Sequence, residues 1–262
     1  MKRHADDRTG LGAWKGQAFL SIGRALYLGP AGDNSPHAHH AVQVCVSLAT
    51  PFRLWHDTGP WYEYDGVVVS PDVRHQLDGG SGDLVLFYVE PEGRHGRHHS
   101  RARSNRVWRL PRTMVESVRE TARRITSRRP DPESLSNAFE ELMASAGFAR
   151  ESARRLDRRV EESIARLREF PRDRRTMLDL ARHAGLSPSR FRHLFRRDVG
   201  MSAQSYIVWL RIHDACAAIA RGLSLSEAAH HAGFSDASHF TRTFRKTFGL
   251  APSQIADRLT LM

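Results

Sequence analysis

An internal repeat near the C-terminus restricts the fold of this chain more than any other feature of its sequence. The segment Leu180–Ser187, LARHAGLS, returns 48 positions later as Ala228–Ser235, AAHHAGFS. After one inserted residue the match continues 49 positions apart, where FRHLFR from Phe191 corresponds to FTRTFR from Phe240. Self-similarity of this kind means that one supersecondary unit occurs twice.

Each copy carries the signals of two short helices joined by a tight turn. Gly185 and Gly233 suit the left-handed geometry that ends a helix. Ser187 is a favourable N-cap with Pro188 in the first helical turn, and Ser235 or Asp236 is the matching cap of the second copy. Phenylalanines four residues apart supply a buried side for the second helix of each copy. The repeat therefore predicts two helix-turn-helix units.

The second helix of each unit has an outer face of polar and basic side chains, as expected of a helix in a major groove. The expected DNA contacts are Ser187, Ser189, Arg190, Arg192, His193, Arg196, Arg197, Ser235, Ser238, His239, Thr241, Arg242, Arg245 and Lys246. Arg192 and Arg242 are the strongest candidates for reading bases, because a bidentate arginine–guanine contact is the commonest specific one.

The charge and the spacing of the units favour the same partner. The chain has 40 Lys and Arg against 29 Asp and Glu, a net charge of +11, and the segment from Pro171 onward has 14 basic and 7 acidic residues. Such an excess favours a polyanion. Between the copies, Ser202–Arg221 has one helical pattern. Its ~20 residues extend ~30 Å, close to the ~34 Å of one DNA turn. The two units can therefore enter successive grooves.

Residues from about 157 to 258 resemble the DNA-binding domain of the AraC/XylS family. The run GFSDASHFTRTFRKTFG in the second copy carries the resemblance most clearly. The resemblance implies seven helices and base reading in double-stranded operator DNA. An activator that contacts RNA polymerase and forms a homodimer is our further expectation, with repression as the alternative to activation. The resemblance assigns base reading to Ser189, Arg192, His193, Ser238, His239, Thr241 and Arg242. Ala237 departs from the longer polar residues that some members carry there.

The first part of the chain has a different periodicity. Short β-branched and aromatic runs, broken by Gly, Pro, Asp and Asn, lie at Ala18–Leu28, Val42–Leu48, Phe52–Trp55, Val67–Ser70 and Leu84–Val89. Several alternate with period two, which predicts an antiparallel sheet in a small barrel or sandwich. Two helical patterns follow, at Thr113–Ser127 and Glu133–Ala146.

The overall expectation is an α+β chain of two domains, with an N-terminal cupin-like β-barrel and a C-terminal all-α domain with two helix-turn-helix units. We expect a sensing domain at 1–110 and a DNA-binding domain at 151–262. Residues 111–150 are either a helical linker or a dimerisation segment.

A histidine-rich stretch, PHAHHAVQVCVSL from Pro36, is the most informative part of the first domain. In an extended strand His37, His39, Gln43 and Cys45 share one face. With His75 they resemble the two cupin motifs, although Gln43 replaces the usual carboxylate and the second motif is one residue short.

Three interpretations of this cluster remain open. It is a set of satisfied polar residues, or a pocket for a small-molecule effector, or a metal site. The effector pocket consists of His37, His39, Gln43, Cys45, Trp55, His75 and Phe87. It follows the rule that ligand pockets are apolar with few polar anchors, and we rank it first. The metal site would bind a divalent transition ion through His37, His39 and His75, with Cys45 or water completing the shell.

The leading functional hypothesis is a cytoplasmic, ligand-responsive transcription regulator. A metal-responsive regulator, a metal-dependent cupin enzyme with a DNA-binding tail, and an architectural DNA binder are the alternatives. The sequence lacks a Ser–His–Asp signature, a phosphate loop and a Rossmann glycine pattern, so we do not expect an enzyme. It has no signal peptide pattern and no run of 18 apolar residues, so we expect no membrane association. Its two cysteines are not expected to pair.

Overall fold

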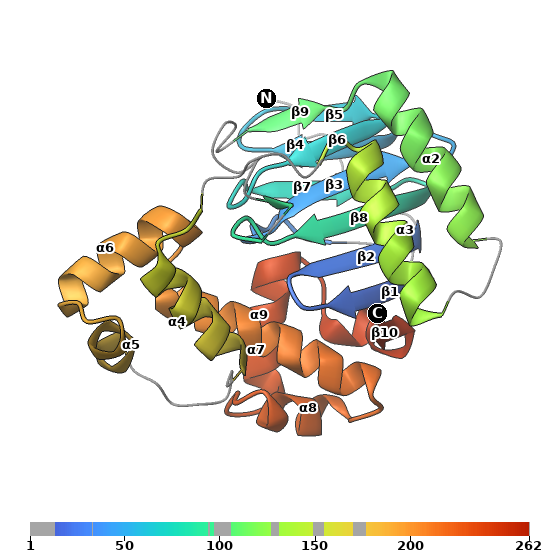
Figure 1. Ribbon diagram of the computed structural model, residues 1–262. Helices are drawn as coiled ribbons and strands as arrows, with labels where there is room; N and C mark the ends of the chain where they lie inside the picture. The colour runs from blue at the N-terminus through green and yellow to red at the C-terminus, as the bar shows by residue number, and fades with distance from the viewer. Residues whose placement is uncertain are drawn as a thin grey trace, which may run out of the picture.

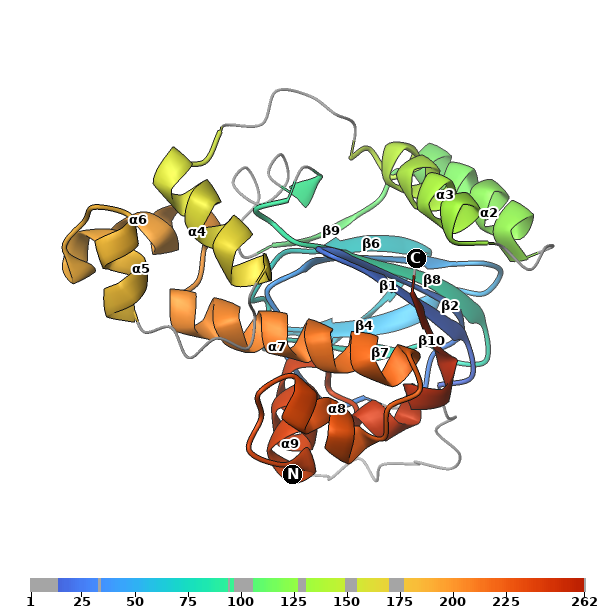
Figure 2. The same ribbon diagram turned by 60° about the horizontal axis from the view of Figure 1, so that its bottom comes forward.

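The computed structural model describes residues 14–32, 34–93, 95–96, 106–126, 131–148, 155–169 and 177–261. Two facing β-sheets form the first part, a helical pair covers one of them, and the remaining helices lie at one side (Figures 1 and 2). A seven-stranded sheet has the order β10-β1-β2-β8-β3-β6-β9, and a three-stranded sheet has the order β5-β4-β7. The strands are β1 (Gln17–Ser21), β2 (Arg24–Pro30), β3 (Val42–Ser47), β4 (Phe52–His56), β5 (Trp61–Tyr64), β6 (Gly66–Val69), β7 (His75–Asp78), β8 (Asp83–Val89), β9 (Val107–Arg109) and β10 (Leu259–Leu261).

All five predicted strand regions form strands, and the first, Ala18–Leu28, forms a hairpin of β1 and β2. The predicted barrel is only partly correct. Within the described residues the hydrogen bonding divides into two sheets and does not close, although an isolated bridge joins His37 to His75 of β7. Strands β5, β9 and β10 each pair with a single neighbour and are edges. The arrangement is therefore an open pair of sheets.

The central strands β3 and β8 are buried on both faces. Gln43 and Cys45 of β3 pair with Tyr88 and Leu86 of β8, whose side chains point between the two sheets. The alternate residues, such as Phe87, point outward and pack under helices. This explains why these strands are near-continuous apolar runs.

The helical pair α2 (Arg112–Thr126) and α3 (Pro132–Ser145) lies on the outer face of the larger sheet (Figure 2). The apolar stripes predicted from the sequence, including Val118 and Phe139, are wholly buried there. Arg24 of β2 donates to Glu140 of α3 at 2.9 Å. The pair is thus a cover for the sheet, and its main apolar stripes are occupied within the chain.

The C-terminal helices are α4 (Arg158–Glu169), α5 (Met177–His183), α6 (Pro188–Val199), α7 (Ala203–Ala220), α8 (Leu225–His231) and α9 (Ala237–Phe248). The predicted cap of the first unit is present, because the Ser187 hydroxyl accepts from the amide of Arg190, and Ser202 caps α7. In the second unit Asp236, rather than Ser235, caps the helix by accepting from the His239 amide at 2.7 Å. Among the described helices none is long and apolar enough to cross a membrane.

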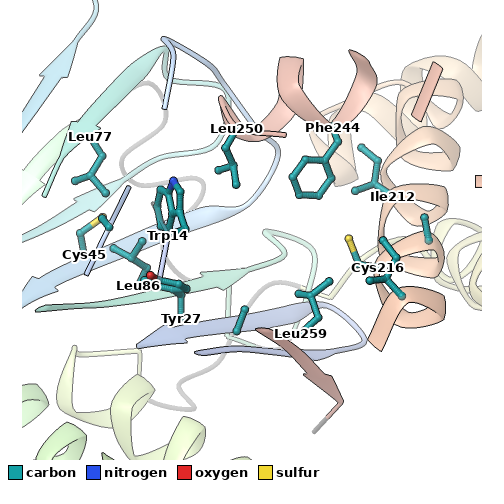
Figure 3. Packing of buried hydrophobic residues seen from close by; sticks show 14 of the residues in the cluster. Trp14, Tyr27, Cys45, Leu77, Leu86, Ile212, Cys216, Phe244, Leu250 and Leu259 are labelled. Atoms are coloured by element: carbon teal, nitrogen blue, oxygen red, sulfur yellow. The ribbon is translucent and has the colours of Figure 1, made fainter. Parts of the chain in front are cut away.

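The sheets and the C-terminal helices share one hydrophobic core. Figure 3 shows Cys45, Leu77 and Leu86 of the sheets in the same cluster as Ile212 of α7 and Phe244 of α9. The last strand, β10, pairs in parallel with β1, so the end of the chain becomes part of the N-terminal sheet. Near residue 151 the chain therefore changes from strands and the helical pair to the C-terminal helices, but one hydrophobic core includes residues from both sides of that point.

Candidate functional site

The first candidate surface is formed by α6 and α9, the second helices of the two repeated units. Phe191 and Phe195 in α6, and Phe240 and Phe244 in α9, are buried beneath them. Every residue expected to contact DNA lies on these two helices, at the N-cap of α6 or directly before the N-cap of α9, and all are exposed except the half-buried Thr241. The repeat thus places two equivalent polar faces toward solvent.

Some of these side chains already have partners within the chain. Arg197 forms an ion pair with Asp198 at 2.8 Å, and Asp198 also accepts from the amide of Asp157. His239 lies 3.1 Å from the Ser235 hydroxyl and packs edge-on against Phe234. In the described part of the chain no hydrogen bond or ion pair involves the side chain of Arg192 or Arg242. These two guanidinium groups, like those of Arg190, Arg196 and Arg245, are therefore available for contacts with DNA.

The second candidate site lies between the sheets, where His37, His39 and His75 meet. One potential ligand atom from each lies within 4.8 Å of the other two, and all three residues are buried. Gln43 Oε1 lies 2.7 Å from His39 Nε2 and 3.0 Å from His75 Nε2. The Gln43 amide nitrogen donates to Cys45 Sγ at 2.9 Å. The structure therefore brings together five of the seven residues expected to bind an effector or metal.

Backbone carbonyls fix the tautomer of all three imidazoles. Nδ1 of His37, His39 and His75 lies 2.8, 3.0 and 2.9 Å from the carbonyls of Ser35, Ala41 and Val73. A carbonyl only accepts, so each Nδ1 carries the proton and each Nε2 keeps a lone pair. Burial, with repulsion from the neighbouring imidazoles, lowers the pKa of His37 to about 3 and lowers the pKa of His75 as well. The cluster is a set of neutral bases.

Two expected members lie elsewhere, and two neighbours are unexpected. Phe87 points to the opposite face of the sheet, where it packs against Phe139 of α3. Trp55 alternates with the inward-facing Leu54 and lies beneath the guanidinium of Arg74. Period-two alternation could have excluded Phe87 from the expected effector pocket. Leu86 shares the inner face of the sheet with Cys45, and its neighbour Phe87 therefore points to the opposite face.

The aromatic rings beside the cluster are Tyr88 and Phe248. Their centroids lie 5.3 and 6.1 Å from that of His39. Tyr88 follows the alternation of β8, whereas Phe248 comes from the end of α9 and no sequence signal placed it here.

A buried charged network joins the first helix-turn-helix unit to the sheets. Arg168 of α4 pairs with Glu90, which directly follows β8, and lies 3.6 Å from Glu92. Trp209 of α7 donates to Glu90 at 2.8 Å, and His40 pairs with Glu92 at 2.9 Å. Sequence periodicity does not reveal this network, because its members lie in a loop and on two helices far apart in the chain.

A cavity of about 90 Å³ lies between the sheets and the C-terminal helices, and its wall is almost entirely apolar. Several of the residues in Figure 3 line it, including Trp14, Tyr27, Cys216 and Phe244. A larger cavity of about 390 Å³ lies next to it, and Glu90 and His213 line both cavities. The polar residues Ser21, Arg168, Asp214 and Arg221 line only the larger one.

Comparison with known proteins places the C-terminal part in a family. Residues 180–258 match the model of a helix-turn-helix domain family. The arabinose operon regulatory protein of Escherichia coli strain K12 is 32% identical over 101 residues, which cover 38% of this chain and 35% of that protein. The virulence regulon transcriptional activator VirF of Yersinia enterocolitica is 32% identical over 124 residues, 44% of this chain and 46% of VirF. The chain thus spans between about a third and a half of these curated relatives.

Over nearly the whole chain the fold resembles that of ToxT from Vibrio cholerae. The apo form of a ToxT variant from strain SCE256 has a TM-score of 0.63 at 13% sequence identity, over 92% of this chain and 100% of ToxT. The fold is thus similar to that of ToxT, and residues 180–258 form a helix-turn-helix domain that contains both α6 and α9. The sequence matches are to transcription regulators, and residues 180–258 belong to the matched helix-turn-helix domain family.

Proposed function

We propose that the whole protein is a sequence-specific transcription regulator that reads double-stranded operator DNA with α6 and α9. The observation that carries this proposal is the pair of equivalent, exposed polar faces on two repeated helices. Helix α7 separates the two units, and its 18 residues correspond to ~27 Å, near the length of one DNA turn. Activation through RNA polymerase and assembly as a homodimer belong to the same proposal.

Selection of binding sites from a random duplex pool by the full-length protein tests this function. We expect a defined motif with two half-sites about one helical turn apart. Arg192→Ala and Arg242→Ala should each cost about 1–3 kcal/mol on the selected duplex and relax preference at one or two bases. Arg197→Ala should weaken binding to all sequences alike, and by less, because Arg197 is engaged by Asp198. No enriched motif, or equal losses on selected and random DNA for both arginine variants, would contradict sequence reading by these helices.

We further propose that the histidine site responds to a divalent transition metal, in preference to the organic effector that the sequence favoured. The ligand atoms of His37, His39 and His75 are at most 4.8 Å apart, which leaves space for an ion between them but none for an organic molecule. The Nε2 lone pairs of His39 and His75 face the Gln43 oxygen at 2.7 and 3.0 Å, and three acceptors without a hydrogen among them repel one another. A cation removes that repulsion.

The donor set indicates which ions are suitable. Neutral imidazoles suit Zn²⁺, Ni²⁺, Co²⁺ and Fe²⁺, and a backbone carbonyl on the second ring nitrogen orients the ring as in many metal sites. The neutral amide of Gln43 adds no charge, so the site should bind more weakly than one with a carboxylate. When bound, the ion supplies a positive charge that fixes the three imidazoles. The competing explanation is a reversed Gln43 amide, whose two hydrogens would satisfy both Nε2 atoms.

Titration of the protein with Co²⁺ distinguishes the two explanations. We expect visible d–d absorption bands that saturate at one ion per chain. His39→Ala should abolish them, whereas His56→Ala, at a partly exposed histidine of β4, should leave them unchanged. Absent bands, or bands that persist in His39→Ala, would assign the cluster to internal hydrogen bonding.

A second candidate is an amphipathic small molecule in the cavity between the sheets and the C-terminal helices. The apolar cavity adjoins the larger one, whose wall includes Arg168 and Arg221. Nε2 of His213, which lines both, is buried and has no hydrogen-bond partner in the described structure. ToxT from V. cholerae strain SCE256 has been crystallised with an unsaturated fatty acid bound. Oleate should raise the melting temperature of the wild type, and Cys216→Trp, which fills the apolar cavity, should abolish that rise.

A further inference from the structure

We infer that occupation of the histidine site is transmitted directly to α9, the second recognition helix, through the contact of Ser35 with Gly249. This inference rests on the proposed metal site and adds the route by which the ion reaches the DNA-binding surface. No sequence pattern indicates this route, because more than 160 positions separate the histidines from α9.

The contact at the end of α9 is short and made by the backbone. The amide of Ser35 donates to the carbonyl of Gly249 at 2.7 Å, and the Ser35 hydroxyl donates to the same oxygen at 3.2 Å. Gly249 ends α9 in the left-handed conformation, with φ of +74°. A Cβ at this position would lie 2.4 Å from the Ser35 oxygen and 2.6 Å from His37 Nδ1. Glycine is required here because the histidine segment touches the helix end.

The same serine is bonded to the histidine site. Its carbonyl accepts from His37 Nδ1 at 2.8 Å, so Ser35 connects His37 on one side with Gly249 on the other. His37 is in turn fixed to His75 by two backbone hydrogen bonds of 2.9 Å. A second connection passes through Phe248, whose ring lies beside those of His39 and Tyr88. Each step between the proposed ion and the helix is therefore a direct contact.

The direction of the effect follows from two observations. The imidazole ligand atoms lie within 4.8 Å of one another, and bonds of ~2.0–2.1 Å to one ion would hold the three rings, and Ser35 through His37, in a single arrangement. Only the C-terminal end of α9 is covered by this contact, while Ser238, His239 and Arg242 remain exposed. The ion thus fixes the orientation of α9 without covering its DNA face. Fixing that orientation in advance lowers the ordering cost of binding, so DNA affinity should rise.

Two matched glycine variants test the route in the full-length protein. Gly249 and Gly200 end the two recognition helices, both with positive φ, so alanine causes similar backbone strain at each. At Gly200 the nearest atom to a new Cβ is His40 Cε1 at 3.9 Å, an ordinary contact, whereas at Gly249 the Cβ must displace Ser35 and His37. Gly249→Ala therefore breaks the proposed route, and Gly200→Ala is its control.

The measurement is affinity for a fluorescent duplex obtained from the selection, with and without saturating Co²⁺. Couplings between sites are commonly 5–150-fold, and we expect Co²⁺ to tighten binding by about tenfold in the wild type and in Gly200→Ala. Gly249→Ala should lose this tightening while still showing the Co²⁺ absorption bands. Bands with no change in wild-type affinity, or the same tightening in Gly249→Ala, would overturn the route and leave the metal site standing. Absence of bands in the wild type would overturn both.

Hydrogen exchange on the wild type gives a test that needs no variant. The Ser35 amide is the donor to Gly249, so Co²⁺ should slow its exchange and that of the peptide around Gly249. Exchange that is unchanged by saturating Co²⁺ would overturn the inference even if Gly249→Ala failed to fold.

Discussion

The two helix-turn-helix units have nearly the same sequence pattern, but they are attached to the rest of the molecule differently. The second unit, α8 and α9, shares its hydrophobic core with the sheets, and the chain after it continues into β10. The first unit, α5 and α6, has a core formed mainly with α4 and α7 and lies away from the sheets (Figure 1). That core also includes Ala41 and packs against Tyr88 of β8, and the charged network from Arg168 to Glu90 and Glu92 is a second connection to the sheets.

A sequence repeat therefore determines the local structure of each copy, but it does not determine how each copy packs against the rest of the molecule. Both copies have the caps and paired phenylalanines that make a recognition helix. The attachments come from residues outside the repeat: the histidine segment, the loop after β8, and the last strand. The second unit thus shares the apolar core of the sheets, whereas the first combines an apolar contact through Ala41 and Tyr88 with groups that charge and pH can alter.

The largest expected effect compares equivalent phenylalanines of the two units. Phe191 and Phe240 are both completely buried, and alanine at either should cost about 3–5 kcal/mol of unfolding free energy. Phe240→Ala should also speed amide exchange in β1 and β2, because its core is continuous with the sheets. Phe191→Ala should speed exchange in α4–α6 alone. Denaturant unfolding with hydrogen exchange measures both, and equal exchange in β1 and β2 for the two variants would remove the distinction.

A smaller effect tests the charged attachment of the first unit. Arg168→Ala leaves Glu90 and Glu92 buried without their guanidinium partner. Breaking a buried pair costs ~3–5 kcal/mol, and because Arg168 is 28% exposed we expect about 2 kcal/mol. Arg158→Ala is the control on the same helix, because its pair with Glu162 is exposed and should contribute below ~0.5 kcal/mol. Similar losses for the two variants in urea unfolding would mean that the network does not attach the unit.

Sequence reasoning found the parts of the molecule that depend on local chemistry. The repeat and its caps predicted both helix-turn-helix units. Strand parity predicted that His39, Gln43 and Cys45 share one face, and in the structure the three side chains are in contact. The second motif histidine, His75, also lies where its resemblance to a cupin motif indicated. These signals act over a few residues, where capping, periodicity and side-chain chemistry determine the outcome.

The parts that sequence reasoning missed depend on long-range contacts. Strand β10 has only three residues and is a strand because β1 provides an unpaired edge. The helical pair was expected to be a linker or a dimer interface, but its apolar stripes cover the sheet. The contact of Phe248 and Gly249 with the histidine segment joins residues more than 200 positions apart. No periodicity in a single sequence encodes such pairings, which follow from how layers pack.

The smallest expected effect per unit change is that of pH on the free energy of unfolding. It acts through Glu90, which belongs to the charged network beside the first unit. Burial, together with the neighbouring Glu92, raises the pKa of Glu90 to about 7, against the opposing effects of Arg168 and the Trp209 N–H. Besides these groups, the Glu90 carboxylate is near Tyr206, and its pKa in an unfolded chain is about 4.5. Between these values the folded chain holds a proton that the unfolded chain has lost.

The sign of the pH dependence follows from that difference. The stability due to protonated Glu90 is complete below about pH 4.5 and is lost as pH rises through about 7. Each bound proton contributes at most ~1.4 kcal/mol per pH unit. Between pH 5 and 8 the wild type should therefore lose more unfolding free energy than Glu90→Gln. Glu162→Gln, at an exposed carboxylate of α4, should keep the wild-type slope in urea unfolding. If the Glu90→Gln slope matched that of the wild type, Glu90 would be charged throughout, and the attachment of the first unit would be as insensitive to pH as that of the second.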